Sequence, residues 1–239
     1  MTMDAVETYA VRLGDDALVL SQRLAWWASR APELEEDLAL TNIALDLLGQ
    51  ARALLGRAGD EDELAFLRSE REYRNVLLVE QPNGDFAQTI VRQLLFSTFQ
   101  LARYEALVDA ADEVIAGVAA KAVKEVAYHR DHARRWTLRL GDGTDESHAR
   151  MTAALERLWP YTHELFEGDD VDREAGVDPA TLYDGWRADV AETLTAATLD
   201  VPADGWRPTG GRQGRHTEAL GLLLAEMQSL HRAHPGATW

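Results

Sequence analysis

Residues 112–140 read DEVIAGVAAKAVKEVAYHRDHARRWTLRL, and Gly141-Asp142-Gly143 follows directly. Apolar side chains recur through this segment at steps of three and four residues, which is the spacing of one face of an α-helix. The two glycines that follow it are a helix stop. The pattern predicts one uninterrupted helix, roughly 45 Å long at about 1.5 Å per residue.

Comparable amphipathic segments lie on both sides, separated by Gly, Pro and Asp, and strand signals are almost absent. They predict helices at residues 13–29, 32–56, 60–68, 85–110, 145–167, 178–198 and 217–231, with a break at Pro160. Long helices in succession, joined by short connections, are typical of an up-and-down four-helix bundle. The sequence therefore predicts an all-α protein with additional C-terminal helices, in a single domain over residues 1–239.

The balance of charges limits the kinds of partner. The 239 residues include 24 Lys plus Arg against 41 Asp plus Glu, a net charge of −17, and 46% are hydrophobic. Such an acidic chain repels phosphodiester backbones and anionic lipid, which argues against nucleic acid or a membrane as the main partner. No apolar run reaches the roughly 18 residues of a membrane span, and Met1–Ala10 lacks the basic region of a signal peptide. We expect a cytoplasmic protein.

Several kinds of chemistry are excluded by composition and motif. Cysteine is absent, which excludes disulfides, thiolate metal sites, iron–sulfur ligation and cysteine nucleophiles. The serine-hydrolase motif G-x-S-x-G and the glycine-rich phosphate-binding motifs are absent as well. The remaining candidates for a functional site are polar side chains on the helices and in one loop.

Polar or small residues interrupt the apolar faces of the predicted long helices. Leucine is expected on a face that packs into a bundle, so these residues are the informative ones. They are Gln22, Asn42, Asp46, Gly49, Gln93, Gln100, Lys121, Lys124, Glu125, Tyr128, His129 and His132. We expect them to meet near the middle of the bundle. Two of them are the chain's only lysines, since every other basic residue is Arg.

Long four-helix bundles use such positions for carboxylate-bridged di-metal centres, with Glu on two helices and Glu-x-x-His on the other two. This sequence departs from that pattern. Asp46 is followed three residues later by Gly49, and Glu125 by Tyr128, so neither imidazole is in register. His129 is displaced by one residue, which rotates it by about 100° around the helix. The other two helices offer glutamines where carboxylates are needed, so the sequence predicts a degenerate site without metal.

Three interpretations of these residues stay open. The principal one is a buried polar network in which Lys121 and Lys124 balance the carboxylates, because an uncompensated buried carboxylate is costly. The second is a single metal ion bound by Glu125, His129 and His132, which share a helix face. The third is salt bridging at the protein surface.

The loop at residues 207–216 carries three arginines and no acid in an otherwise acidic chain. Glycines let backbone amides approach an anion, and Arg binds phosphate through two hydrogen bonds. Arg207, Arg212 and Arg215 are therefore candidate contacts to a partner or to a phosphate group. The alternative is an ordered loop whose arginines pair with acids of this chain or of a partner.

Consecutive tryptophans on one helix indicate assembly. Trp26 and Trp27 cannot both face one core, because neighbouring helical positions are rotated by about 100°. Aromatic residues are enriched in protein interfaces. We expect an oligomer.

Five long segments carry a resemblance to a known family. They are residues 38–53 (LALTNIALDLLGQARA), 77–94 (LLVEQPNGDFAQTIVRQL), 120–137 (AKAVKEVAYHRDHARRWT), 140–148 (LGDGTDESH) and 209–231 (TGGRQGRHTEALGLLLAEMQSLH). They resemble the C subunits of the bacterial phenylacetyl-CoA 1,2-epoxidases, also described as phenylacetate-CoA oxygenases. The resemblance runs from end to end and is more specific than a shared ferritin-like fold.

The resemblance implies a ferritin-like, structural and non-catalytic subunit of a multicomponent monooxygenase of aerobic phenylacetate catabolism. In that family the related catalytic subunit holds the di-iron centre and the CoA thioester. A small bridging subunit and a reductase with FAD and an iron–sulfur cluster deliver electrons from NADPH. No cofactor is expected in this chain, and Gly49 and Tyr128 stand where imidazoles would be.

The resemblance also implies a hetero-oligomer, with a homodimer possible when the chain is alone. The arginines of the 207–216 loop then become candidate contacts to the CoA phosphates. Two alternatives remain: a metal-binding ferritin-like oxidase in its own right, which would use Glu125, His129 and His132, and a stand-alone homodimeric helical scaffold.

Overall fold

A computed structural model describes residues 3–237, so the first two residues of the segment Met1–Ala10 lie outside it. Within the described range the regular structure is entirely α-helical and 3-10 helical, without a strand. The all-α prediction is confirmed. The chain divides into two compact units, one of residues up to Pro82 together with those from Gly210 onward, and the other of residues 83–209. The single-domain assignment stays a prediction.

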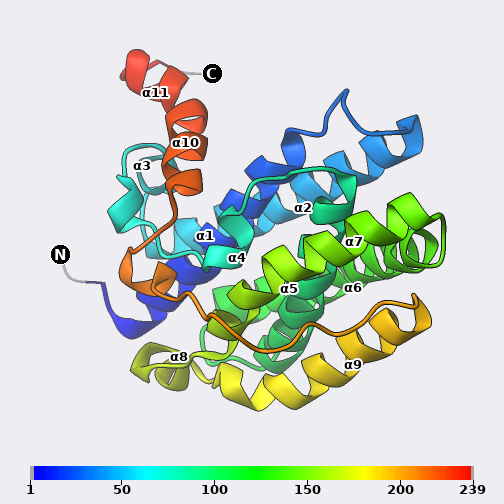
Figure 1. Ribbon diagram of the computed structural model, residues 1–239. Coiled ribbons are helices and arrows are strands. Elements are labelled where there is room, and N and C mark those ends of the chain that lie inside the picture. The colour runs from blue at the N-terminus through cyan, green and yellow to red at the C-terminus, as the bar shows by residue number, and fades with distance from the viewer. Residues whose placement is uncertain (1–2, 238–239) are drawn as a thin grey trace. The chain divides into compact units, whose positions relative to one another are not determined.

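In the first unit two long helices, α1 (Ala5–Ala25) and α2 (Leu34–Ala58), pack side by side, as the blue ribbons of Figure 1 show. The Ser21 hydroxyl donates to the Ala44 carbonyl at 2.7 Å, and Gly14 faces Leu55, so the helices run in opposite directions. A Cβ at Gly14 would lie 2.9 Å from the Leu55 side chain. Glycine at this position therefore permits the close approach of the two helices.

Shorter elements from both ends of the sequence complete the first unit. They are α3 (Glu61–Phe66), η1 (Glu70–Glu72), α4 (Leu77–Glu80), η4 (Gly211–Gln213), α10 (Glu218–Met227) and α11 (Ser229–Ala233). The predicted helix at residues 217–231 is thus divided into two, which meet at Gln228.

In the second unit, α5 (Phe86–Leu107) and α6 (Glu113–Gly141) form the other long pair. Phe86 at the start of α5 meets Trp136 near the end of α6, with ring centroids 5.0 Å apart, so these helices are also antiparallel. Two further helices pack on this pair, α7 (Asp145–Leu158) and α9 (Tyr183–Ala196). The connecting elements are η2 (Trp159–Phe166), α8 (Asp170–Ala175) and η3 (Pro179–Leu182).

The predicted starts and stops of the helices have visible causes. The Asp85 carboxylate accepts a hydrogen bond from the Gln88 amide at 2.9 Å and caps α5. Asp112 caps α6 in the same way through the amides of Val114 and Ile115. The predicted break at Pro160 is confirmed, because α7 ends at Leu158 and continues as a 3-10 helix.

Two boundaries differ from the prediction. Helix α1 begins at Ala5 rather than at residue 13, because Asp4 and Glu7 form a reciprocal capping box. Its last turn ends at Ala25, and Ser29 has a left-handed backbone conformation with φ of 66°. Helix α8 was not expected from the sequence.

Helix α2 differs from the other long helices in its exposed apolar surface. Its buried side includes Leu40, Ile43, Leu47 and Leu54, yet four more of its leucines are exposed. Among the described residues, α2 is also a helix whose length and mean hydropathy would let it cross a membrane, a test that core helices of soluble proteins pass as well.

Candidate functional sites

The candidate residues on α1 and α2 form no buried group. Gln22 and Asp46 are half-buried, while Asn42 and Gly49 are exposed. A Cβ added at Gly49 would have no neighbour within 4 Å. The prediction of a buried network is therefore wrong for Asn42 and Gly49, because α2 presents this side to solvent and its other side to α1.

The candidate residues on α5 are buried, as predicted. Gln93 and Gln100 are each 1% exposed. Every residue of α5 from Ala87 to Leu101 is buried, so neighbouring elements cover this part of the helix on all sides. These glutamines belong to the core of the second unit.

The candidates on α6 divide between surface and core. Lys121 and Lys124 are exposed, and Tyr128 is 49% exposed. His129 and His132 are buried, and the Tyr128 ring lies beside both, with centroids 6.4 and 6.3 Å apart. The prediction of burial is therefore wrong for both lysines and for Tyr128.

Lys121 pairs with Glu125 outside any buried network, as in the third interpretation, a salt bridge at the surface. Its Nζ lies 3.0 Å from Glu125 Oε1, one helical turn away. The Glu125 side chain is 15% exposed and that of Lys121 is 73% exposed. The pair is thus a salt bridge at the surface of α6, of the kind worth about 0–1 kcal/mol.

The donor set does not fit a di-metal centre. Within residues 3–237, no three His, Asp or Glu side chains form a group that could hold a metal ion. Glu125, His129 and His132 thus form no such group in the described part of the chain, and the alternative of one metal ion on them has no geometric support. The amide groups of Gln93 and Gln100 are neutral and cannot replace the carboxylates that two divalent ions require.

A buried charged network lies elsewhere, in the first unit, and sequence reasoning missed it. Asp15 and Asp16 of α1 are both fully buried. Asp15 accepts two hydrogen bonds from the Arg68 guanidinium, one of 3.0 Å, and one of 2.7 Å from the Arg74 amide. Asp16 accepts from Arg212 at 2.8 and 3.0 Å and from a backbone amide at 2.9 Å. Each carboxylate therefore has an Arg partner and a backbone donor.

Glu80 of α4 is the third fully buried carboxylate of the first unit. It accepts from Asn75 Nδ2 at 2.8 Å and from the Thr217 amide and hydroxyl at 2.7 and 2.8 Å. His216 Nδ1 lies 2.7 Å from the same carboxylate, and its Nε2 lies 3.0 Å from the Tyr73 carbonyl. Because a carbonyl only accepts, His216 Nε2 acts as a donor to Tyr73, and the other ring nitrogen faces the Glu80 carboxyl group.

The three buried carboxyl groups have basic partners within the chain. Asp15 pairs with Arg68 and Asp16 with Arg212, while Glu80 lies against His216. Burial, and then the charge of nearby Asp15, raises the pKa of the Tyr73 phenol above its ordinary value of 10.0, so the phenol keeps its proton and donates to the Ala65 carbonyl. The buried carboxyl groups are therefore bound by side chains and backbone amides of the same unit.

One sequence signal pointed to this network. Two consecutive acids occupy the middle of α1, whose residues 9–21 are all buried. Asp and Glu are almost never fully buried unless they are paired. Acids within a fully buried turn therefore predict basic partners, although they do not say where in the chain those partners lie.

The arginines of the 207–216 loop have different positions. Arg212 is largely buried and bound to Asp16, so the alternative of a loop paired with acids of this chain is confirmed for it. Arg207 is exposed and lies 3.3 Å from Asp204. Arg215 is exposed and lies against Gly210, whose added Cβ would be 2.7 Å from its Nε. Arg212 is therefore not available to a phosphate group.

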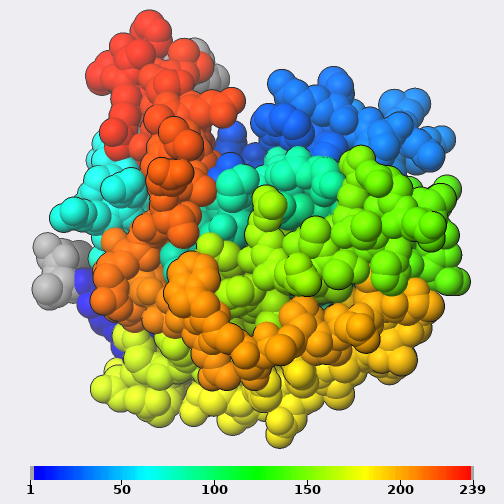
Figure 2. Space-filling view, in the orientation of Figure 1, coloured from blue at the N-terminus to red at the C-terminus, as the bar shows by residue number. Residues whose placement is uncertain are grey.

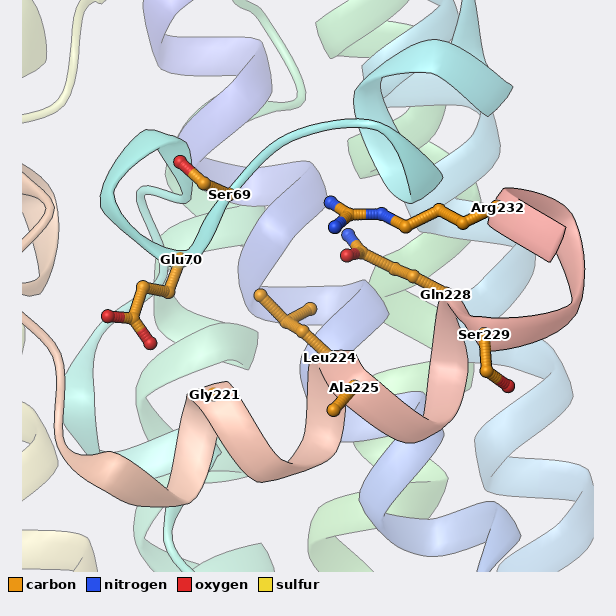
Figure 3. A pocket seen from close by; sticks show the side chains of 8 residues that line it. All are labelled: Ser69, Glu70, Gly221, Leu224, Ala225, Gln228, Ser229 and Arg232. Atoms are coloured by element: carbon orange, nitrogen blue, oxygen red, sulfur yellow. The ribbon is translucent and has the colours of Figure 1, made fainter. Parts of the chain in front are cut away.

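A cavity of about 440 Å³ lies between the η1 region and the α10–α11 segment, both in the first unit (Figure 3). Figure 2 shows α10 and α11, in orange and red, at the surface. Gln228 donates at 3.0 Å to the carbonyls of Ala65 and Arg68, and Arg232 donates at 3.0 Å to that of Phe66. Gln228 and Arg232, two polar residues that line the cavity, therefore cap the C-terminal end of α3.

Comparison with known proteins places the fold in a class. The chain resembles the solved structure of protein 19 with aldehyde deformylating oxidase activity from Synechococcus, with a TM-score of 0.58 and 18% identity over 82% of this chain and 94% of that one. At this identity the likeness shows the fold alone, a ferritin-like helical bundle. The predicted ferritin-like fold is confirmed.

The comparisons of sequence identify the family as well as the fold. Residues 2–239 match the model of the phenylacetic acid catabolic protein family. The chain is also 50% identical to the C subunit of the 1,2-phenylacetyl-CoA epoxidase of Escherichia coli (strain K12), over 99% of this chain and 100% of that protein. The chain therefore belongs to the phenylacetic acid catabolic protein family, and the predicted resemblance is confirmed.

Proposed function

We propose that this chain is a structural, non-catalytic subunit of a multicomponent monooxygenase that epoxidises the aromatic ring of phenylacetyl-CoA. Its role is to pair with the catalytic subunit and stabilise it. One observation carries the proposal: the 50% identity to the C subunit of an epoxidase extends over the full length of both chains. A shared fold alone would not require this level of identity over the whole chain.

The geometry of the candidate site supports the non-catalytic part of the proposal. The position that would carry an imidazole on α2 is the exposed Gly49, and that on α6 is the exposed Tyr128. Lys121 already pairs with Glu125, a remaining carboxylate. The described residues thus offer no matching set of ligands for two metal ions, which supports the non-catalytic assignment.

The cofactors and partners follow from the same proposal. The di-iron centre belongs to the catalytic subunit, where it would supply oxygen activation, and FAD, the iron–sulfur cluster and NADPH belong to the reductase. The complex also includes a small bridging subunit. The chain acts in the cytoplasm, without nucleic acid or membrane, and Arg207 and Arg215 are its exposed candidate contacts to a partner or to CoA phosphate.

Co-expression with the catalytic subunit tests the proposal. Size-exclusion chromatography should show one complex of both chains, and its iron content should match the catalytic subunit alone. The chain purified by itself should contain no stoichiometric iron. Separate elution of the two chains would contradict the pairing.

A Glu125→Ala variant provides the control for metal binding, with Glu113→Ala, an exposed acid of the same helix, as its match. Neither substitution should change the iron content of the complex. Stoichiometric iron in the isolated chain that disappears only in Glu125→Ala would show a metal site in this chain and overturn the non-catalytic assignment.

A further inference from the structure

Two atoms that can both act as acceptors face each other where Glu80 meets His216. The two side chains are 0% and 2% exposed, and His216 Nδ1 lies 2.7 Å from Glu80 Oε2. The other ring nitrogen, Nε2, lies 3.0 Å from the Tyr73 carbonyl and carries a proton, because a carbonyl only accepts. A neutral imidazole then presents a lone pair at Nδ1, and an ionised Glu80 presents another at Oε2.

The short contact between these atoms requires a proton. Two lone pairs at 2.7 Å repel each other, whereas a proton on either atom turns the contact into a hydrogen bond of ordinary length. A protonated imidazole would donate to the carboxylate, and a protonated carboxyl group would donate to the imidazole. In both cases the folded chain holds one proton between Glu80 and His216.

Other charged groups around the pair oppose this proton. The Arg74 guanidinium donates at 2.8 Å to the same backbone carbonyl as His216. The Arg23 guanidinium donates at 3.1 Å to the backbone carbonyl of Glu80, and the exposed acid Glu226 offsets part of its charge. Nearby cations disfavour a further positive charge, while the Glu80 carboxyl group favours it. A pair that holds its proton against two cations releases it more readily than a pair without them.

The pair attaches the C-terminal segment to α4. His216 stands directly before Thr217, the N-cap residue of α10, whose amide and hydroxyl donate to Glu80 Oε1 at 2.7 and 2.8 Å. Glu80 therefore binds the beginning of α10 through both residues. Earlier in the same segment, Arg212 is attached to Asp16 by an ion pair, and its guanidinium keeps its charge at every pH of interest.

The shared proton links this attachment to pH. In an unfolded chain an imidazole releases its proton near pH 6.5 and a Glu carboxyl group near pH 4.3. Above about pH 6.5 the folded chain therefore binds one proton more at this pair than the unfolded chain does. The stability that the pair contributes is complete below about pH 6.5 and is lost as the rising pH removes the shared proton.

We propose that Glu80 and His216 form a proton-dependent latch, in which loss of the proton shared by Oε2 and Nδ1 at rising pH releases α10 and α11 from α4. Arg212 keeps the loop before them attached, and the release withdraws Gln228 from the end of α3. The latch is independent of the pairing with a catalytic subunit, because all its groups lie in the first unit of this chain.

Urea unfolding of the isolated chain between about pH 6.5 and pH 9 tests the linkage. The unfolding equilibrium constant of the wild-type protein should rise by up to about tenfold per pH unit once the shared proton is lost, as linkage requires for one proton. Glu80→Gln should remove this component, because its amide donates to a neutral imidazole and does not titrate. His234→Asn, at an exposed histidine, is the control and should keep the wild-type pH dependence.

His216→Asn is a second variant without a titrating group. The side-chain amide of Asn can donate to Glu80 from about the position of the ring Nδ1, but it loses the bond to the Tyr73 carbonyl. Its stability should therefore be lower than wild type at pH 7, and its pH dependence should match that of Glu80→Gln. This variant decides the question if Glu80→Gln does not fold.

Hydrogen exchange with mass spectrometry locates the opening. Protection factors, which correct for the faster intrinsic exchange at high pH, should fall between about pH 7 and pH 9 in residues 216–233 and in α3. They should stay constant in α6 of the second unit. Residues 211–213 should also keep their protection, because the Arg212–Asp16 ion pair does not titrate in this range.

Two results would overturn the latch. The first is the same pH dependence of unfolding in the wild-type protein and in a folded Glu80→Gln or His216→Asn variant, which would show that the pair holds no proton. The second is protection in residues 216–233 that is constant up to about pH 9, or that falls equally in α6. Either outcome would leave the pair a fixed structural contact.

Discussion

At the residue scale, Arg212 shows how a buried acid can occupy the hydrogen-bond donors of a basic side chain. Its guanidinium donates to both oxygens of Asp16 and to the carbonyls of Arg12 and Arg74 at 3.1 and 2.7 Å. Few donors are then left for a ligand. An arginine in a glycine-rich loop is an anion-site candidate only while no acid of the same chain lies within reach.

Replacing Arg212 with Ala should destabilise the protein by about 3–5 kcal/mol, because it leaves the fully buried Asp16 carboxylate without its counter-charge. Urea unfolding followed by circular dichroism measures the change. Arg207→Ala is the matched control, since Arg207 pairs with Asp204 at the surface and should cost about 0–1 kcal/mol. Equal losses in both variants would show that the buried pair does not stabilise the fold.

A second residue, His163 in the second unit, links stability to pH. Burial lowers the pKa of His163 below its ordinary value of 6.5, the charge of Arg207 acts in the same direction, and Asp204 opposes both. The unfolded chain therefore binds this proton more readily than the folded one. The stability that neutral His163 contributes is complete above about pH 6.5 and is lost as the pH falls through the folded pKa.

His163→Gln should therefore reduce the loss of unfolding free energy between about pH 7 and pH 5. The measurement is a series of urea titrations of both proteins across this range. His234→Gln, an exposed histidine, serves as the control and should follow the wild-type curve. A His163→Gln curve parallel to wild type would contradict the assigned direction.

At the element scale, α3 depends on α10 and α11 for its C-terminal end. A helix of six residues leaves most of its terminal carbonyls without partners. Gln228 and Arg232 supply donors to them from the other end of the sequence. In Figure 3 both side chains extend from the C-terminal segment toward the loop that carries Ser69.

Gln228→Ala should therefore increase amide hydrogen exchange in residues 61–68 without a comparable change in α6. The reason is that the carbonyls of Ala65 and Arg68 each lose one donor, at a cost of about 0.5–1.5 kcal/mol per hydrogen bond, while Tyr73 and Arg232 still donate to them. Hydrogen exchange with mass spectrometry measures this, with Ser229→Ala as the control, because Ser229 donates only to the local Glu226 carbonyl. Unchanged exchange in α3 would show that its stability is set within its own segment.

At the scale of the whole molecule, chain ends that are distant in sequence form one unit. Arg212 meets Asp16 across 196 residues of sequence, and His216 meets Glu80 across 136. The second unit, by contrast, is built from one continuous segment, residues 83–209. The buried charged network of the first unit therefore requires the C-terminal segment, which supplies Arg212 and His216.

The predicted helices agree with the structure where the signals are local. Asp85, Asp112 and Pro160 each act on the next few residues, so their effects could be placed from sequence. The candidate site was predicted less well. Periodicity locates a side chain on a helix face, but it does not show which face meets a neighbour, and so Asn42, Lys121 and Tyr128 were assigned to the wrong side.

The amino-acid pattern was sufficient for the helical class, for the family and for the missing imidazoles at Gly49 and Tyr128, because each is a property of neighbouring or motif residues. The three-dimensional packing was needed to identify the partners of Asp15, Asp16 and Glu80 and the second apolar face of α2. The physical reason is that burial and charge pairing depend on which distant segments come together, and a local helical period carries no information about that.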